Sequence, residues 1–224
     1  MRDLLPPFVL SQIRDRYLAG VADAEAKYDM SRGDEDALTG ALGQAISTPG
    51  AITTVVNGVV FRWSVSYRKV RGRGRGAPEK KFGTDGIFEI DIRDEHGQVL
   101  RRKGLPFQSK KGRAKGQKVV GQARDMIRAC GNGLVVEYTP SGYSGLPAAA
   151  VADSTGKRAE LAHHEKALGQ WLANDFLDCS IGQEGLYFDP DQEQFVGVAP
   201  AQPMSPGHIV STEVVRLSGP ADRS

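Results

Sequence analysis

The stretch over residues 86–111 restricts the fold most, because it reads as two strands joined by a turn. Hydrophobic residues occupy the even positions from 88 to 92, and charged residues the odd positions from 89 to 93. This period of two is typical of a strand with one buried and one polar face. The turn falls at Asp94–Gly97, and the second strand continues to Lys111.

The segments on either side of this hairpin predict a central sheet covered by helices. Residues 117–133 (QKVVGQARDMIRACGNG) predict a helix that ends at glycine, and residues 134–140 (LVVEYTP) predict a buried strand. Upstream, residues 51–70 are rich in β-branched and aromatic residues, with a turn at Asn57-Gly58. Helices are predicted over 8–27 and after Asp34, a suitable N-cap. The order predicts an α/β fold with a central mixed sheet flanked by helices.

Length and composition favour one domain. The chain has 224 residues, and we expect a single domain over 1–190 followed by a peripheral tail over 191–224, whose Pro-, Gln- and Gly-rich start allows flexibility. A second long helix is predicted over 157–182. No apolar stretch reaches about 18 residues, and the start lacks a signal-peptide pattern. With only two, widely separated cysteines, the sequence favours a cytoplasmic protein without a membrane span.

Charge is distributed very unevenly along the chain. Residues 62–118 hold 17 Lys and Arg but 6 Asp and Glu, so that this segment carries +11 although the whole chain carries +2. Such a basic region favours a polyanionic partner, since each neutralised phosphate releases counterions. The alternative is that these loops only keep the protein soluble.

Four polar residues are predicted at positions beside apolar residues, where a strand or helix does not need a polar side chain for its own stability. Gln108 and Lys110 lie two apart, so they share one face of their predicted strand. Asp85 follows glycine and threonine at the mouth of the preceding strand, and Glu35 lies toward the apolar side of the helix that Asp34 caps. Simpler interpretations remain for each: a turn residue at 85, a dipole partner at 35, and a solvated edge strand at 108–110.

This set, in this order, resembles the restriction-endonuclease-like superfamily, often written PD-(D/E)xK, in a Gln-x-Lys variant. The resemblance covers roughly residues 30–140. It rests on Glu35, Asp85, Gln108 and Lys110, with Thr84 in place of proline and Gln108 in place of a carboxylate. It implies a restriction-endonuclease-like core and a metal-dependent nuclease.

The resemblance also implies roles for these residues. Asp85, Gln108 and Glu35 would hold Mg²⁺ or Mn²⁺, and Lys110 would orient and help deprotonate the attacking water. Glu89, on the same strand face as Asp85, and Gln122, near the start of the next helix, are candidates for an outer layer around the site.

The expected function is therefore Mg²⁺-dependent hydrolysis of DNA, with RNA left open, in bacterial restriction or antiphage defence. A homo-oligomer or a partner protein of the defence system is expected. The alternatives are a nucleic-acid-binding subunit that does not cut and a module that docks on an acidic protein. The residues expected to contact backbone phosphates are Arg71, Arg73, Arg75, Lys111, Arg113, Lys115 and Lys118.

Overall fold

The computed structural model describes residues 1–70, 84–192, 194–197 and 206–217. The helices are α1 (Pro7–Ala26), α2 (Tyr28–Ser31), α3 (Glu35–Ile46), α5 (Gln117–Cys130), α6 (Ala148–Asp153), α7 (Arg158–Leu161) and α8 (Leu168–Gln170), with a 3₁₀ turn over Ala162–His164 and a π-helical turn over Trp171–Phe176. The strands are β1 (Ile52–Val56), β2 (Val59–Lys69), β3 (Gly86–Arg93), β4 (Val99–Lys111), β5 (Leu134–Thr139), β6 (Gly142–Pro147), β7 (Lys166–Ala167), β8 (Gln183–Glu184), β9 (Tyr187–Asp189), β10 (Gln194–Val196) and β11 (His208–Leu217).

A mixed sheet forms the centre of the described structure. Its order is β1-β2-β11-β3-β4-β5-β6-β7, and β8 adds a ninth strand by pairing with β4. Strands β3 and β4 run antiparallel, whereas β4 and β5 run parallel. Helix α5 connects β4 to β5, as a parallel pair requires. The expected α/β architecture with a central mixed sheet flanked by helices is confirmed.

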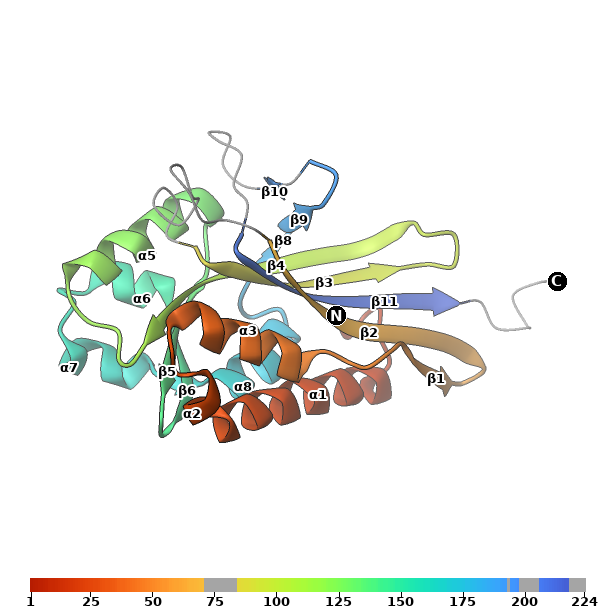
Figure 1. Cartoon of the computed structure of the whole chain (residues 1–224). Coiled ribbons are helices and arrows are strands. Elements are labelled where there is room, and N and C mark those ends of the chain that lie inside the picture. Colours follow the sequence, from red (N-terminus) through yellow and green to blue (C-terminus); the bar gives the residue numbers. More distant parts are fainter. Residues whose placement is uncertain (71–83, 193, 198–205, 218–224) are drawn as a thin grey trace.

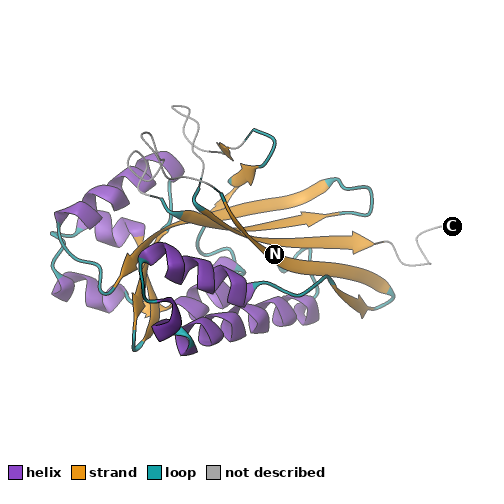
Figure 2. Ribbon diagram, in the orientation of Figure 1, coloured by secondary structure: helices purple, strands orange, loops and turns teal. Residues whose placement is uncertain are grey.

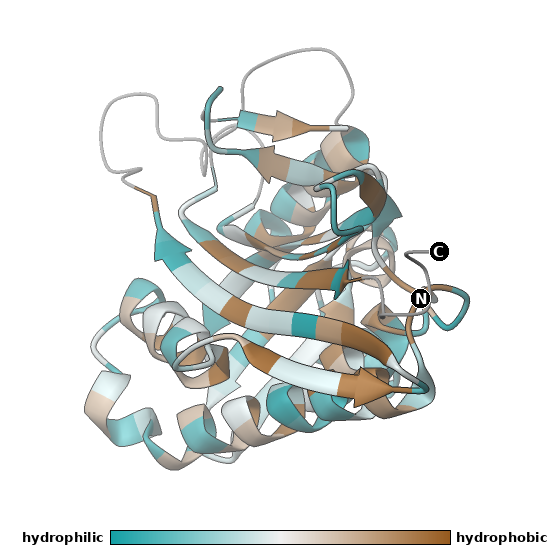
Figure 3. Ribbon diagram, turned by 90° about the vertical axis from the view of Figure 1, so that its right-hand side faces the viewer, coloured by the Kyte–Doolittle hydropathy of each residue, from teal (hydrophilic) through white to brown (hydrophobic). Residues whose placement is uncertain are grey.

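The two faces of the sheet are covered differently. Helices α1 and α3 lie along one face and bury the largest core against it (Figure 1). Helices α5 and α6 cover the β5–β6 end of the other face, where Val119, Met126 and Val135 belong to a second core (Figure 2). Over β3 and β11 the second face carries the small β9–β10 pair, and Cys130 at the end of α5 packs with Ile87 and Ile209 there. Hydrophilic and hydrophobic bands alternate along these strands, as expected for strands with two different environments (Figure 3).

Two predictions about the C-terminal half are wrong. The peripheral tail over 191–224 contains β11, which lies in the middle of the sheet between β2 and β3. Its residues Val210, Thr212 and Val214 are buried against the α1–α3 core. The long helix over 157–182 is broken, because Lys166 and Ala167 pair with β6. Pairing with the sheet thus overrides local helix propensity here.

Other local predictions are confirmed. Asn57 and Gly58 form the β1–β2 turn with φ values of 52° and 79°, the left-handed conformations of a type I′ hairpin. Gly86 permits close packing beside Asp85, because a Cβ there would lie 2.4 Å from the Phe107 ring. None of the helices in the described ranges is long and apolar enough to cross a membrane.

Candidate active site

Antiparallel pairing of β3 and β4 brings Asp85 to Gln108. Gly86 lies opposite Phe107 in this register, and the Asp85 backbone N–H donates to the Phe107 carbonyl at 2.8 Å. Asp85 therefore stands at the start of β3, beside the last residues of β4. Strand β4 lies between β3 and β5, and Gln108 is completely buried. The alternative of a solvated edge strand at 108–110 is therefore wrong.

One carboxylate oxygen of Asp85 collects three hydrogen bonds. Its Oδ2 accepts from Gln108 Nε2 at 2.5 Å, from the Ser109 backbone N–H at 2.7 Å and from Ser109 Oγ at 2.6 Å. Gln108 and Ser109 leave β4 on opposite faces. The Asp85 carboxylate thus lies at the end of the sheet, where it contacts groups from both faces.

Glu35 reaches the same end of β4 from helix α3. Asp34 caps this helix by accepting the Ala37 N–H at 2.7 Å, which confirms the predicted N-cap. Glu35 follows directly. Its Oε1 accepts the Lys111 N–H at 3.0 Å, and its Oε2 lies 3.7 Å from Lys110 Nζ. The Lys110 side chain is 15% exposed and the Glu35 side chain 40% exposed, so only the lysine end of this ion pair is well shielded from water.

A layer of hydroxyl groups lies beneath the two carboxylates. Thr39 Oγ1 is 3.2 Å from Ser109 Oγ and 3.1 Å from the Tyr138 hydroxyl. Burial above all, and more weakly the negative charges of Asp85 and Glu35, raise the pKa of Tyr138, so its hydroxyl stays protonated. The charges of Asp85 and Glu35 therefore both influence the hydroxyl of Tyr138. The two carboxylates lie at the same end of the sheet, as the sequence predicted.

Within the described residues, three buried polar atoms in and around this end of the sheet have no hydrogen-bond partner: Gln108 Oε1, Gln122 Oε1 and Thr84 Oγ1. Gln108 and Thr84 are 0% and 2% exposed. Gln108 faces the side of the sheet that α5 covers, and Gln122 belongs to α5. Buried polar atoms are normally satisfied, and each exception calls for an explanation such as an ion or water. The amide oxygen of Gln108 is also a suitable ligand for a hard cation.

The residues therefore fit a divalent ion held by few protein ligands. Asp85 and the Gln108 amide are adjacent, and Glu35 contacts Lys110 and Lys111 at the same end of β4. This ligand set contains few carboxylates. Within the described ranges, no group of three or more His, Cys, Asp or Glu side chains gathers at metal-binding spacing. Mg²⁺ suits such a site, because it keeps several of its waters.

Glu89 does not join this group. It lies four residues along β3, roughly 13 Å from Asp85 at the usual rise per residue. Its Oε2 accepts the Phe188 N–H at 3.0 Å. Burial raises the pKa of Glu89. The expectation that Glu89 forms an outer layer around Asp85 is corrected, because β9 engages it in a separate pocket.

The basic residues around the site fall into three groups. Exposed lysines lie at the end of β4, after it and at the start of α5: Lys111, Lys115 and Lys118. Their exposure would allow them to contact phosphate groups. Arg113 instead pairs with buried Glu137 at 3.2 Å and with Glu165. It is better explained as a structural residue than as a phosphate ligand. The remaining predicted contacts, Arg71, Arg73 and Arg75, lie outside the described residues.

Sequence reasoning missed a polar cluster beside the site. The Asp36 carboxylate, one residue after Glu35 on α3, contacts His208 Nε2 at 3.1 Å and Lys69 Nζ. The backbone of His208 also donates to the Asp85 carbonyl at 3.0 Å. Strand β11 thus connects α3 to Asp85. The sequence of residues 208–217 favours a strand but contains no local signal that pairs β11 with β3, so sequence reasoning could not have found this connection.

Comparison with protein-family models, with curated proteins and with solved structures found no match to this chain.

Proposed function

We propose that this protein is a Mg²⁺-dependent nuclease that hydrolyses phosphodiester bonds in DNA. The observation that carries the proposal is the buried, unpartnered amide oxygen of Gln108 beside the Asp85 carboxylate, with the Lys110–Glu35 pair at the same end of β4. A structural hydrogen-bond network would satisfy that oxygen. An ion-binding site would leave it available.

The topology supports the same proposal. Helix α3 carries Glu35, β3 begins after Asp85, β4 carries Gln108 and Lys110, and α5 crosses to the parallel strand β5. This is the order that the resemblance to restriction-endonuclease-like nucleases implies. Strand β11, inserted between β2 and β3, is an addition that the resemblance does not include.

Each side chain would have a distinct task in the reaction. Asp85, Gln108 and, through water, Glu35 would hold Mg²⁺, which supplies Lewis acidity toward a phosphate oxygen and acidifies the attacking water. The Lys110 ammonium would donate to the charge that develops on phosphorus-bound oxygens, or orient the water while Glu35 holds the ammonium in place. The exposed Lys111, Lys115 and Lys118 would contact backbone phosphates without base readout.

The deciding experiment is cleavage of supercoiled and linear DNA by the wild type, by Lys110→Ala and by a matched control. Lys27→Ala is suitable as the control, because Lys27 is exposed at the end of α1. We expect cleavage that requires Mg²⁺, stops with EDTA, is retained in Lys27→Ala and falls at least about 100-fold in Lys110→Ala. Cleavage by Lys110→Ala at the wild-type rate would assign the chemistry elsewhere. A parallel RNA substrate tests the choice of nucleic acid.

A second readout tests the ion site without activity. A ligand that binds only the folded state raises Tm by mass action. Mg²⁺ should raise the Tm of the wild type and of Lys27→Ala, and this shift should disappear in Asp85→Asn. The same shift in Asp85→Asn would contradict the proposed ion site.

The second candidate function is a nucleic-acid-binding subunit that does not cut. The amide at position 108 favours it, since this replacement leaves two carboxylates where the resemblance implies three. Tight, salt-sensitive DNA binding without cleavage and without a Mg²⁺-dependent Tm shift would support this candidate.

A further inference from the structure

His208, the first residue of β11, connects the two segments that carry Asp85 and Glu35. Its backbone N–H donates to the Asp85 carbonyl at 3.0 Å, and its imidazole Nε2 lies 3.1 Å from Asp36 Oδ1. Asp36 follows Glu35 directly in the first turn of α3. His208 therefore contacts both the residue that precedes β3 and the chain neighbour of Glu35.

The contacts of α3 reach across the start of β3. In the order of the sheet, β3 lies between β11 and β4. On the β4 side, Glu35 accepts the Lys111 N–H at 3.0 Å. On the β11 side, Asp36 contacts His208. The first turn of α3 is thus fixed on both sides of Asp85, and these contacts determine where Glu35 lies relative to it.

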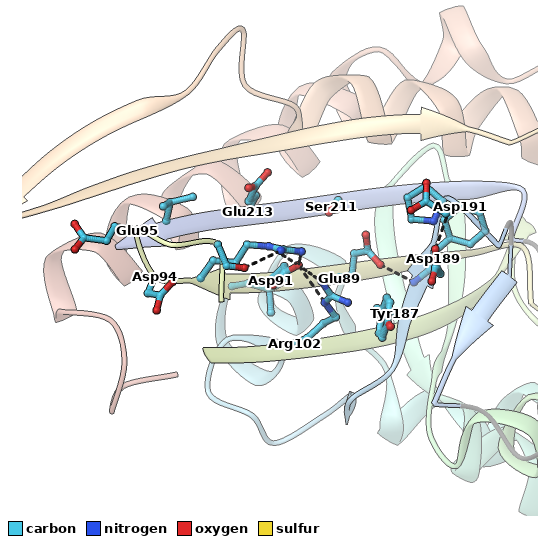
Figure 4. A pocket seen from close by; sticks show the side chains of 16 residues that line it. Glu89, Asp91, Asp94, Glu95, Arg102, Tyr187, Asp189, Asp191, Ser211 and Glu213 are labelled. Atoms are coloured by element: carbon cyan, nitrogen blue, oxygen red, sulfur yellow. Dashed lines mark hydrogen bonds and ion pairs between the residues drawn. The ribbon is translucent and has the colours of Figure 1, made fainter. Parts of the chain in front are cut away.

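The alternation of side chains along β11 directs His208 toward α3. Val210 and Thr212 are buried on the side of α1 and α3, and His208 shares their face of the strand. Ser211 and Glu213 instead line a pocket on the opposite face of the sheet (Figure 4). The imidazole therefore lies between the sheet and α3, and only 4% of the side chain is exposed.

Both ring nitrogens of His208 have partners, which gives the ring one orientation. Burial lowers the pKa of His208, so its imidazole is neutral near pH 7 and carries one hydrogen. A carboxylate only accepts hydrogen bonds, so Nε2 carries the hydrogen that Asp36 accepts. Nδ1 then accepts from the Tyr67 hydroxyl at 2.9 Å, since burial raises the pKa of Tyr67 to about 12 and keeps this group protonated.

Tyr67 is itself fixed by the close approach of α3 to β2. Gly43 of α3 leaves no room for a Cβ beside the Tyr67 ring, and a Cβ on Gly40 would lie 3.4 Å from the Tyr67 hydroxyl. The rings of Tyr67 and His208 stack with their centroids 6.0 Å apart. A chain of contacts thus runs from β2 through His208 to the first turn of α3.

We infer that His208 is a positioning residue for the proposed Mg²⁺ site, where it sets the position of Glu35 relative to Asp85. His208 does not bind the ion itself. It acts on Glu35 through Asp36, and on Asp85 through its backbone N–H. Removing contacts that orient metal ligands typically lowers metal affinity about 10-fold to 100-fold. This role rests on the proposed function, since it requires an ion at Asp85.

The test compares Mg²⁺ binding by the full-length wild type and three variants. His208→Leu removes both ring contacts and keeps the backbone bond to Asp85. His208→Gln restores a side-chain N–H that can donate to Asp36. The control is Thr212→Val, which removes the buried 2.6 Å hydrogen bond to the Tyr17 hydroxyl on the same face of β11. Because the imidazole of His208 is neutral, none of these changes alters the net charge near pH 7.

The first readout is the Mg²⁺ dissociation constant, obtained from the dependence of Tm on Mg²⁺ concentration, which needs no activity. His208→Leu should raise this constant about tenfold, and His208→Gln should stay within about threefold of the wild type. Thr212→Val should leave the constant unchanged although its Tm falls, because it loses a buried hydrogen bond away from the site. The Mg²⁺ concentration that half-saturates DNA cleavage should follow the same order.

A dissociation constant in His208→Leu within about twofold of the wild type would overturn the inference. An equal rise in Thr212→Val would also overturn it, because general loosening of the sheet would then explain both. If His208→Leu does not fold, Tyr67→Phe decides instead. It removes only the hydroxyl at Nδ1 and should raise the constant about threefold. A wild type without any Mg²⁺-dependent Tm shift would overturn the proposed ion site together with this role, whereas the outcomes above concern His208 alone.

Discussion

Two buried polar clusters flank Lys110, and they differ in how completely they are satisfied. Glu137 lies opposite Lys110 on β5 and is completely buried. Its carboxylate accepts from the Ala114 N–H, from Ser144 Oγ and from Arg113 and Arg158. Gln108 is equally buried and donates to Asp85, but its own amide oxygen has no partner among the residues that the structure describes.

We interpret the Glu137 cluster as structural, and the Asp85 cluster is the one that we propose to be functional. The Glu137 cluster fastens the loop after β4 to β5 and β6, and it needs nothing from outside the protein. The Asp85 cluster contains a buried acceptor that folding does not satisfy, although leaving such a group unpaired costs about 1–3 kcal/mol. A site that retains this cost is suited to bind something, and a divalent ion is the ligand that its oxygen atoms favour.

The same carboxylate-to-amide change in each cluster tests whether the two clusters differ in function. Asp85→Asn should lower the DNA cleavage rate by about 100-fold to 1,000-fold, because it removes the charge that holds the ion. Glu137→Gln should leave the rate per folded molecule within about twofold. Rates are measured below the lower Tm of the pair. Equal loss in both variants would mean that the clusters do not differ in function.

For stability we expect the opposite order, with a larger effect at Glu137 than at Asp85. Glu137→Gln should lower the free energy of unfolding by about 3 kcal/mol, roughly 6–12 °C in Tm, because two arginines lose a buried partner charge. Asp153→Asn, at an exposed position of α6, is the control and should have no measurable effect. Thermal and denaturant unfolding measure both. A loss in Glu137→Gln no larger than the control would show that Glu165 alone compensates the arginines.

A smaller effect is expected when the missing carboxylate is restored. In Gln108→Glu a second negative charge replaces the amide that donates to Asp85, so the Tm in EDTA should fall by a few degrees. Mg²⁺ affinity should rise about tenfold, because hard cations favour carboxylates. The Mg²⁺-dependent Tm shift measures this, with Gln117→Glu, exposed at the start of α5, as the control. An unchanged shift in Gln108→Glu would indicate that position 108 does not face the ion.

The sequence was sufficient to predict the part of the site that depends on local pattern. The period-two alternation of β3 and the turn at Asp94–Gly97 predict the hairpin, whose register places Asp85 beside Gln108, and the Asp34 cap sets the start of α3. These predictions need only neighbouring residues. The structure agrees with each of them.

Long-range pairing was beyond the reach of the sequence. Nothing in residues 208–217 specifies that they insert between β2 and β3, so the contact of His208 with Asp36 could not be foreseen. Arg113 belongs to a basic run, and only the structure shows that buried Glu137 engages it. Glu89 has the same strand face as Asp85, but the β9 segment that covers it comes from about 100 residues later in the chain.

The smallest expected effect concerns Glu89. In hydrogen bonding it lies between Glu137, whose carboxylate is fully satisfied, and Gln108, whose amide oxygen is not. It accepts one backbone N–H, yet burial raises its pKa above that of an ordinary carboxyl group. The folded state therefore keeps a proton that the unfolded state releases. The resulting stabilisation is complete below the unfolded pKa, about 4.3, and is lost as the pH rises through the higher folded value.

Glu89→Gln removes this dependence while it keeps an oxygen for the Phe188 N–H. The difference in Tm between Glu89→Gln and the wild type should therefore be near zero at pH 4. At pH 7 the variant should melt about 2 °C above the wild type. Glu184→Gln, at an exposed position, controls for the loss of one charge and should show no such trend. A difference that stays constant between pH 4 and pH 7 would mean that Glu89 titrates alike in both states. Glu89 would then be interpreted, like Glu137, as a carboxylate whose hydrogen bonds within the protein satisfy it.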